Sequence, residues 1–470
     1  MALQIFRTKH FLAAEPSEQG LKRCLSAWDL TFLGIGAIIG TGIFVLTGVA
    51  AATQAGPAVI LSFVLAGFAC AFAALSYAEL SASIGGCGSA YGYSYVAFGE
   101  LCAFIIGWDL LLEYSIAVAT VANGWSGYFA NALSAMGIPL PEQLTKSPEL
   151  GGIINLPASA IIFMLMGLLI MGVKHSARAN NAMVFVKLIT IIVFIAIAAF
   201  NVHPENWQPF MPFGWFNTLS DGHNTGVLAG ASLVFFAYVG FDAVSTATEE
   251  AKNPQRDLPL GIVVSLLFCT VIYIIVSGLL TGVVHYTELN VSSPVAHALN
   301  LLGHTWASAL VSTGVIAGLS TVMLVLYYAL TRIIFAMSRD GLLPAFFNKV
   351  DPATQTPVRV IVLCGLLMAL IAGLIPLSEL AELVNIGTLA AFVLVCFGVL
   401  VLRVTKPDMP RPFRTPFSPL FPALGVLSCG ALMAFLPSLT WLRFIIWLVI
   451  GLIVYFSYSM QNSKLAKTDG

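Results

Sequence analysis

Residues 31–44 read TFLGIGAIIGTGIF, and this stretch decides how the chain folds. Four glycines and two threonines interrupt an apolar run that would otherwise form one membrane-spanning helix. Glycine costs roughly 1 kcal/mol per helix position relative to alanine, so we expect the helix to open at Gly40, Thr41 and Gly42. A new helix starting there would expose free N–H groups, which bind anions such as a carboxylate. The alternative is that the glycines only allow close packing between helices.

The composition is that of a polytopic membrane protein. Of 470 residues, 59% are hydrophobic and only 9% are charged. The net charge of -1 points to no nucleic acid and no acidic partner. Eight cysteines are scattered without metal-ligand spacing, so we expect no metal and no cofactor.

Apolar stretches of about 20 residues, the length that crosses a bilayer core, occur twelve times. Lysine and arginine concentrate in the two tails and in alternate loops, so the positive-inside rule places both termini in the cytosol. We expect the chain to lie in the plasma (inner) membrane. The twelve expected spans start near Trp28, Pro57, Ala97, Leu156, Asn181, Thr225, Leu260, Trp306, Val358, Leu380, Leu420 and Trp441.

A second interruption is expected in the sixth span, where Gly240 and Asp242 stand in the middle of the apolar run SLVFFAYVGFDAVSTATEE. It follows the first by roughly 200 residues. Paired broken helices at equivalent places are the best sequence indication of a transporter site. Spans one to five and six to ten would then be two copies of one unit, and an odd number of spans per copy makes the copies inverted.

Three motifs, in order, resemble a known family. They are GAIIGTGIF in the first span, FFAYVGFDAVSTATEEAKNPQRDLPLGI across the sixth, and LTRIIFAMSRDGLLP at the end of the eighth. They are similar to the amino acid–polyamine–organocation (APC) transporters, most closely to the cationic amino acid transporter (CAT) branch in a bacterial form. The resemblance covers residues 21–414.

The resemblance implies an all-α fold with twelve transmembrane helices. Helices 1 and 6 would be unwound at mid-membrane, and two extra C-terminal helices would stand outside a five-plus-five inverted repeat of the leucine-transporter type. The expected divisions are a cytosolic tail (1–27), the first repeat (28–202), an extracellular loop (203–224), the second repeat (225–403), a cytosolic loop (404–419), the last two spans (420–460) and a cytosolic tail (461–470).

The resemblance also implies a substrate site between the two interruptions. Backbone N–H groups around Thr41 and Gly42 would bind the carboxylate, with Ile38 and Gly40 opening the helix. The substrate amine would meet carbonyls released by the second interruption, which agrees with the negative end of a half-helix. The residues expected there are Phe236, Ala237 and Val239, with Phe236 also a candidate gate, its alternative being a packing aromatic.

Lys187 lies inside the fifth span, where a lysine costs about 2.5 to 3.5 kcal/mol on insertion scales. One explanation is that its stem reaches the nearby interface. The other, which the resemblance implies, is that its ammonium replaces the sodium ion of sodium-driven relatives and carries the driving proton. Ser320 and Thr321 are candidate partners, and hydrogen bonding within their own helix is the alternative.

Carboxylates inside a span usually face the bundle interior or a cavity. Asp109 and Glu113 are four residues apart and hence share a helix face. We expect the Glu113 carboxylate to pair with Lys187 or with a second charge on the substrate. We expect Asp109 to be a solvated group near the end of the span. We expect Asp242 to cap the new half-helix. Met323 is a candidate for the side-chain pocket, with core packing as its alternative.

Together these observations predict a secondary active transporter, and no enzyme. It would take up L-amino acids with protons by alternating access, most simply small neutral ones such as alanine, with cationic ones (arginine, lysine) also considered. The expected partners are the amino acid, the proton and membrane lipid; an accessory subunit cannot be read from the sequence. The alternative function is a proton-independent exchanger, in which Lys187 is structural. The absence of charged rings and of filter repeats argues against a channel.

Overall fold

The structure is a computed structural model. It describes residues 7–8, 25–84, 89–171, 177–218, 224–248, 251–349, 351 and 356–465. Most of the expected tails, 1–27 and 461–470, therefore lie outside the described residues.

The described chain is almost entirely helical, as predicted, and its one sheet is a two-stranded antiparallel pair, β1 (Asn217–Thr218) and β2 (Asn224–Thr225). The α-helices before this pair are α2 (Ala27–Ile38), α3 (Thr47–Ala50), α4 (Val59–Ile84), α5 (Ser89–Ala97), α6 (Glu100–Ala135), α7 (Leu156–Ile170) and α8 (Ala177–Ala198). Those after it are α9 (Val227–Val234), α10 (Ala243–Thr246), α11 (Pro254–Val283), α12 (Pro294–Leu301), α13 (Thr305–Arg339), α14 (Val358–Leu374), α15 (Leu377–Thr405), α16 (Leu420–Ala434), α17 (Ser438–Val454) and α18 (Met460–Asn462).

Seven helical stretches in the described part of the chain are long and apolar enough to cross a membrane. The first of them, Ala27–Ile84, is 58 residues long and holds both the first and the second expected span. Four shorter apolar helices of 10–17 residues fall where further spans were expected: Leu156–Ile170, Met183–Ala198, Val358–Leu374 and Leu420–Ala434. The count of twelve spans and the inverted repeat remain predictions.

The helix starts follow from local sequence. Ser26 caps α2 through a capping box, since its hydroxyl accepts from the Asp29 amide while the Asp29 carboxylate accepts from the Ser26 amide. The Asn155 side chain accepts from the Ala158 amide at the start of α7. These caps satisfy amides that have no carbonyl partner within their own helix.

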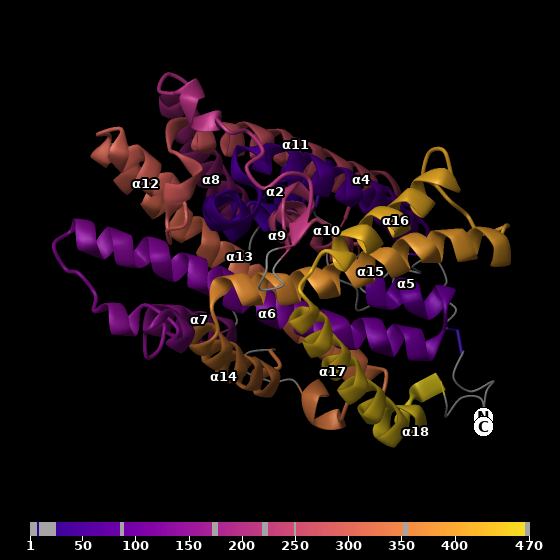
Figure 1. Ribbon diagram of the computed structural model, residues 1–470. Helices are drawn as coiled ribbons and strands as arrows, with labels where there is room; N and C mark the ends of the chain where they lie inside the picture. The colour runs from indigo at the N-terminus through magenta and orange to yellow at the C-terminus, as the bar shows by residue number, and fades with distance from the viewer. Residues whose placement is uncertain are drawn as a thin grey trace.

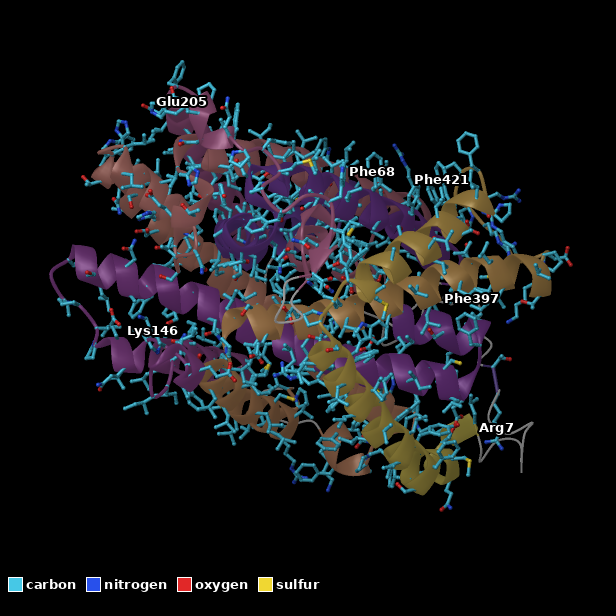
Figure 2. All side chains as sticks on the ribbon, viewed as in Figure 1. Arg7, Phe68, Lys146, Glu205, Phe397 and Phe421 are labelled. Atoms are coloured by element: carbon cyan, nitrogen blue, oxygen red, sulfur yellow. The ribbon has the colours of Figure 1, made fainter. Side chains whose placement is uncertain are left out.

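The helices pack into one bundle around α2 and α9 (Figure 1). Helix α13 packs along α6, and α11 packs against both α4 and α2. Large apolar side chains such as Phe68, 60% exposed, and Phe397, 47% exposed, project from the outer surface (Figure 2). An outer surface of this kind suits a lipid environment, where apolar groups need no burial in protein.

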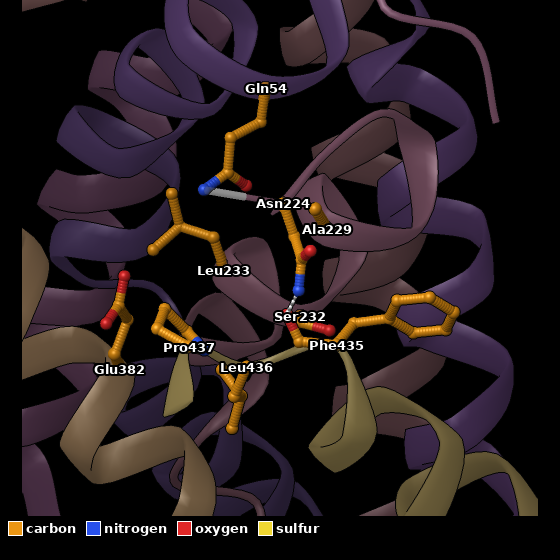
Figure 3. Close-up of a pocket in the computed structure, with 9 residues that line it drawn as sticks. All are labelled: Gln54, Asn224, Ala229, Ser232, Leu233, Glu382, Phe435, Leu436 and Pro437. Carbon is orange, nitrogen blue, oxygen red and sulfur yellow. Dashed lines mark hydrogen bonds between the residues drawn. The ribbon is translucent and has the colours of Figure 1, made fainter. Parts of the chain in front are cut away.

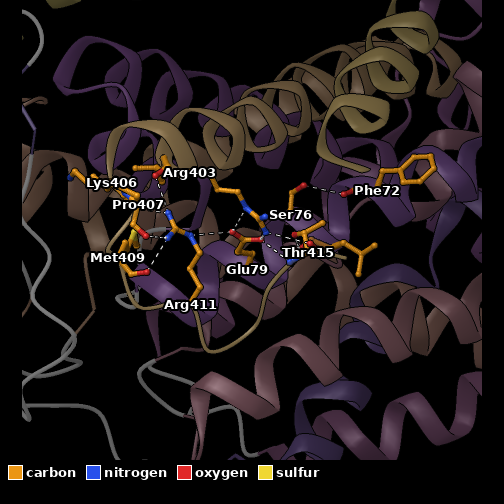
Figure 4. A network of polar contacts seen from close by, with 11 residues as sticks. Phe72, Ser76, Glu79, Arg403, Lys406, Pro407, Met409, Arg411 and Thr415 are labelled. Carbon is orange, nitrogen blue, oxygen red and sulfur yellow. Dashed lines mark hydrogen bonds and ion pairs between the residues drawn. The ribbon is translucent and has the colours of Figure 1, made fainter. Parts of the chain in front are cut away.

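A buried ion-pair network joins α4 to the segment after α15 (Figure 4). Glu79 of α4 accepts from Arg403 at 2.6 Å and 3.1 Å, and its Oε1 lies 3.4 Å from Arg411. The Thr415 amide donates to the same carboxylate at 2.7 Å. Glu79 thus fixes α4 to the end of α15 and to the segment that follows it, because one carboxylate binds two arginines and a backbone amide.

Candidate functional site

The first interruption lies where the glycine pattern predicts it. Helix α2 ends at Ile38, Ile39 takes an extended conformation with ψ at 101°, and helix resumes at Thr41 and continues as a π-helix, η1 (Gly42–Leu46). N–H groups at the start of such a new helix have no carbonyl one turn earlier. The hydroxyl of Thr41 is fully buried and has no hydrogen-bond partner among the described residues.

The second interruption lies in the sixth expected span. Helix α9 tightens into a 3₁₀ turn, η7 (Phe235–Tyr238), after which Val239 is extended and Gly240 has φ at +118°. This φ lies in a region that side chains with a Cβ rarely adopt, which is why glycine is required there. The short helix α10 then starts at Ala243.

The two interruptions touch each other. A Cβ on Gly42 would stand 2.3 Å from the Ala237 Cα, and a Cβ on Gly240 would stand 2.9 Å from the Ala37 carbonyl oxygen. The Tyr273 hydroxyl of α11 contacts both, at 2.9 Å from the carbonyl oxygens of Ile38 and Ala237. The glycines therefore do both things that the motif predicts: they allow close packing between helices, and they allow the backbone to open.

A cavity of about 20 Å³ lies between the interruptions. A volume of this size holds one or two water molecules. Six of the expected site residues line it, namely Ile38, Gly40, Thr41, Gly42, Phe236 and Val239. The remaining lining residues are Ala37, Ala117, Val121, Val322 and Leu326, so the side chains around the cavity are almost all aliphatic or aromatic and none is charged.

Lys187 of α8 reaches the first interruption. Its side chain is 1% exposed, and its Nζ donates to the carbonyl oxygens of Gly36 at 2.8 Å and Ile39 at 3.1 Å. Gly318 of α13 makes room for it, because a Cβ there would stand 2.7 Å from the lysine Cε. The ammonium thus lies at the C-terminal end of α2, where the helix dipole favours a positive charge.

Ser320 and Thr321 do not bind Lys187 in this structure. Thr321 donates to the Gly318 carbonyl, one turn back in its own helix. Ser320 donates to the Ile316 carbonyl and accepts from the Trp125 indole at 3.0 Å. Both hydroxyls therefore follow the within-helix alternative.

Glu113 does not line the cavity, and the hydrogen bonds of Lys187 in the described part of the chain go to backbone carbonyls and not to Glu113. It is 1% exposed and interacts electrostatically with Asp242 and Asp109, and with the Thr388 hydroxyl of α15. Asp109 is also 1% exposed, so it is not a solvated group. Asp242 makes no side-chain capping bond to α10; its Oδ2 instead accepts from the Tyr114 hydroxyl at 3.0 Å. The three carboxyls share a region between α6, α10 and α15.

The rotation of α13 about its axis explains why the prediction for Met323 was wrong. Met323 is fully buried and does not line the cavity, whereas Val322 and Leu326 do. Neighbouring helix positions point about 100° apart, so a correct helix with an error of one residue places the wrong side chain inward. Tyr273, the residue that joins the interruptions, was missed, although an isolated tyrosine in an apolar span is a signal for an internal hydrogen bond.

Two interrupted, touching helices around a small uncharged cavity define a membrane transporter for a small molecule. The sequence comparison agrees: residues 25–461 match the amino acid permease family model. The chain belongs to this family, within the APC superfamily, and is related to the cationic amino acid transporters.

Similar proteins cover nearly the whole chain. The branched-chain amino acid permease BcaP of Bacillus subtilis (strain 168) is 50% identical over 469 residues, which are 98% of this chain and 99% of the relative. The methylthioribose transporter of the same strain is 50% identical over 467 residues, with the same coverage. The human cationic amino acid transporter 4 is 33% identical over 571 aligned positions, covering 95% of this chain and 88% of the relative.

Proposed function

We propose that this permease takes up neutral L-amino acids together with protons by alternating access, across the inner membrane and with both termini in the cytosol. The observation that carries the proposal is the cavity between the two interruptions. Its walls offer opened backbone at two places and no charged side chain, which suits a zwitterion with an aliphatic side chain. In this conformation the cavity has room only for water, so the two helices must move apart to admit the substrate.

The substrate's two charges would meet opposite helix ends. N–H groups at Thr41 and Gly42 start a helix and favour the carboxylate, and the unpartnered Thr41 hydroxyl adds a donor. The 3₁₀ turn Phe235–Tyr238 ends a helix and favours the ammonium at its carbonyls. Residues Phe236, Ala237 and Val239 are the proposed amine contacts, and Phe236 the proposed gate.

The side-chain subsite favours aliphatic substrates. Ala117, Val121, Val322 and Leu326 contribute only methyl and methylene groups. We therefore propose substrates from alanine to the branched-chain amino acids, in line with the name of the BcaP relatives. Arginine and lysine have less support, since Glu113 stays outside the lining. A competition series of alanine, leucine, arginine and methylthioribose ranks these classes directly.

Lys187 is the proposed coupling group. While protonated, its ammonium is attracted to the carbonyl end of α2 and binds Gly36 and Ile39 across the interruption. Loss of the proton would weaken this attraction and free the first helix to change conformation. A buried lysine loses its proton more easily than an exposed one, because burial destabilises the charged form.

The test is uptake into vesicles by wild-type protein and the Lys187→Ala variant. We expect an inward proton gradient to accelerate alanine uptake only in the wild type, while alanine exchange at equal pH survives in both. Lys187→Met, which keeps the side-chain volume, controls for the cavity that alanine leaves. Proton-driven uptake by Lys187→Ala would exclude Lys187 as the coupling group; wild-type exchange without any response to the gradient would support the exchanger alternative.

A further inference from the structure

A second cavity, of about 40 Å³, lies at the start of α15, apart from the substrate site (Figure 3). Its polar lining includes Gln54, Asn224, Ser232 and Glu382, and the loop between α16 and α17 closes it. The Gln54 Oε1 is buried there without a hydrogen-bond partner among the described residues. A polar cavity of this volume holds about three or four water molecules, at about 10 to 15 Å³ each.

A polar stripe on α15 leads inward from this cavity. Glu382, Asn385 and Thr388 follow one another at three-residue spacing and so lie on one face of the helix. The stripe spans about 9 Å along the helix axis. Asn385 is fully buried; its Nδ2 donates to the carbonyl oxygens of Ser232 and Leu233, but its Oδ1 has no partner among the described residues.

The stripe ends at the three buried carboxyls. The Thr388 hydroxyl interacts with Glu113, which faces Asp109 and Asp242. Both oxygens of Asp109, the Glu113 Oε1 and the Asp242 Oδ1 lack partners within the described chain. The fully buried Tyr77 hydroxyl also lacks one there, and it interacts electrostatically with Asp242 and Glu113.

Three carboxyls cannot be buried together as free anions, because each buried charge costs several kcal/mol and like charges repel. Among the described residues, Tyr77, Tyr93 and Tyr114 interact with these carboxyls, and a tyrosine supplies no positive charge. No cluster of three His, Cys, Asp or Glu side chains in the described residues could hold a metal ion. Binding of protons by these carboxyls would remove the cost of burying their charges.

We propose that the cavity and the α15 stripe form a route by which protons reach Glu113. The inference rests on the proposed proton coupling and adds a second proton-binding group, Glu113, whose protonation would accompany that of Lys187. Water in the cavity brings the proton past Glu382, and the free Asn385 Oδ1 holds a water in line with Thr388. In this structure the Thr388 hydroxyl donates to the Val384 carbonyl. For the relay it rotates toward Glu113, its oxygen accepts one proton from the water and its own proton passes to the carboxylate, so that only O–H bonds form and break.

The experiment uses purified full-length protein in vesicles that contain a pH-sensitive dye. External L-alanine is added and the acidification of the lumen is measured, with alanine exchange at equal pH measured on the same preparation. The variants are Thr388→Val, which keeps the shape but removes the relay, and Thr388→Ser, which restores the hydroxyl. Thr281→Val is the matched control, since Thr281 is fully buried and donates within its own helix as Thr388 does.

We expect Thr388→Val to lose at least about tenfold in acidification rate, and Thr388→Ser, Thr281→Val and every exchange rate to stay within about twofold. A smaller loss in Thr388→Val, a parallel loss of exchange, or a failure of Thr388→Ser to restore acidification would overturn the route while leaving proton coupling intact. Alanine transport by wild-type protein without acidification would overturn proton coupling itself, and the route with it.

Discussion

The two interruptions differ in how they are held open. At the first, the backbone strays from helix at Ile39 and Gly40, and its released carbonyls are bound by side chains from other helices, Lys187 and Tyr273. At the second, the chain makes a 3₁₀ turn and then passes through Gly240 at φ +118°. Tyr273 binds a carbonyl at both openings, but only the first has a titratable partner, Lys187, and only the second passes through a glycine with positive φ.

This difference assigns the two halves of the site different parts in transport. An interruption held by a titratable lysine can respond to a proton, whereas one fixed by a left-handed glycine keeps its shape. We therefore expect the first helix to move during alternating access and the second to provide a constant binding surface. Substitutions at matched positions can test this division.

The largest effect is expected from Gly42→Ala. The new Cβ would lie 2.3 Å from the Ala237 Cα, which is backbone and cannot rotate away. Overpacking of this kind costs roughly 1 to 3 kcal/mol, on the order of a tenfold to hundredfold loss in alanine uptake. Uptake is measured per folded transporter, with the amount fixed by size-exclusion chromatography. Uptake at the wild-type rate would show that the interruptions separate at this point.

An intermediate effect is expected from Tyr273→Phe, which removes the hydroxyl shared by Ile38 and Ala237. The one O–H proton is shared between the two carbonyls, and its loss leaves both oxygens without this partner, at a cost of about 1 to 3 kcal/mol in stability. We expect a lower unfolding temperature and slower uptake, since the helices lose their common anchor. Tyr238→Phe, which removes one bond to the Phe63 carbonyl, is the control and should lose about half as much. Equal losses would remove the special role given to Tyr273.

The smallest effect is expected from Gly40→Ala. A Cβ there would meet its nearest atoms only at 3.9 Å and 4.0 Å, so it fits without strain. Because Gly40 lines the cavity, the methyl group should narrow the space for the substrate. We expect alanine uptake to fall by about twofold or less and leucine uptake to fall further. Equal loss for both substrates would contradict the assignment of this cavity to the substrate side chain.

Much of the fold could be predicted because apolar length and glycine pattern act locally. The opening at Gly40 and the turn at Gly240 follow from residue types that helices disfavour. The direction of a side chain depends on the rotation of its helix about the helix axis and on which neighbouring helix it packs against. A short sequence pattern specifies neither. Met323 and Glu113 were therefore assigned to the cavity, although Val322 lines it and Glu113 turns toward α15.

The central claim is that peptide groups of two opened helices bind both charges of an amino acid. Competition against radiolabelled L-alanine binding by alaninamide and by N-acetylalanine tests it without any mutation. Each analogue lacks one charge, and a lost charged hydrogen bond costs about 1.5 to 3 kcal/mol. The account predicts that both compete at least about tenfold more weakly than alanine. Competition by either analogue as strong as that by alanine would contradict it.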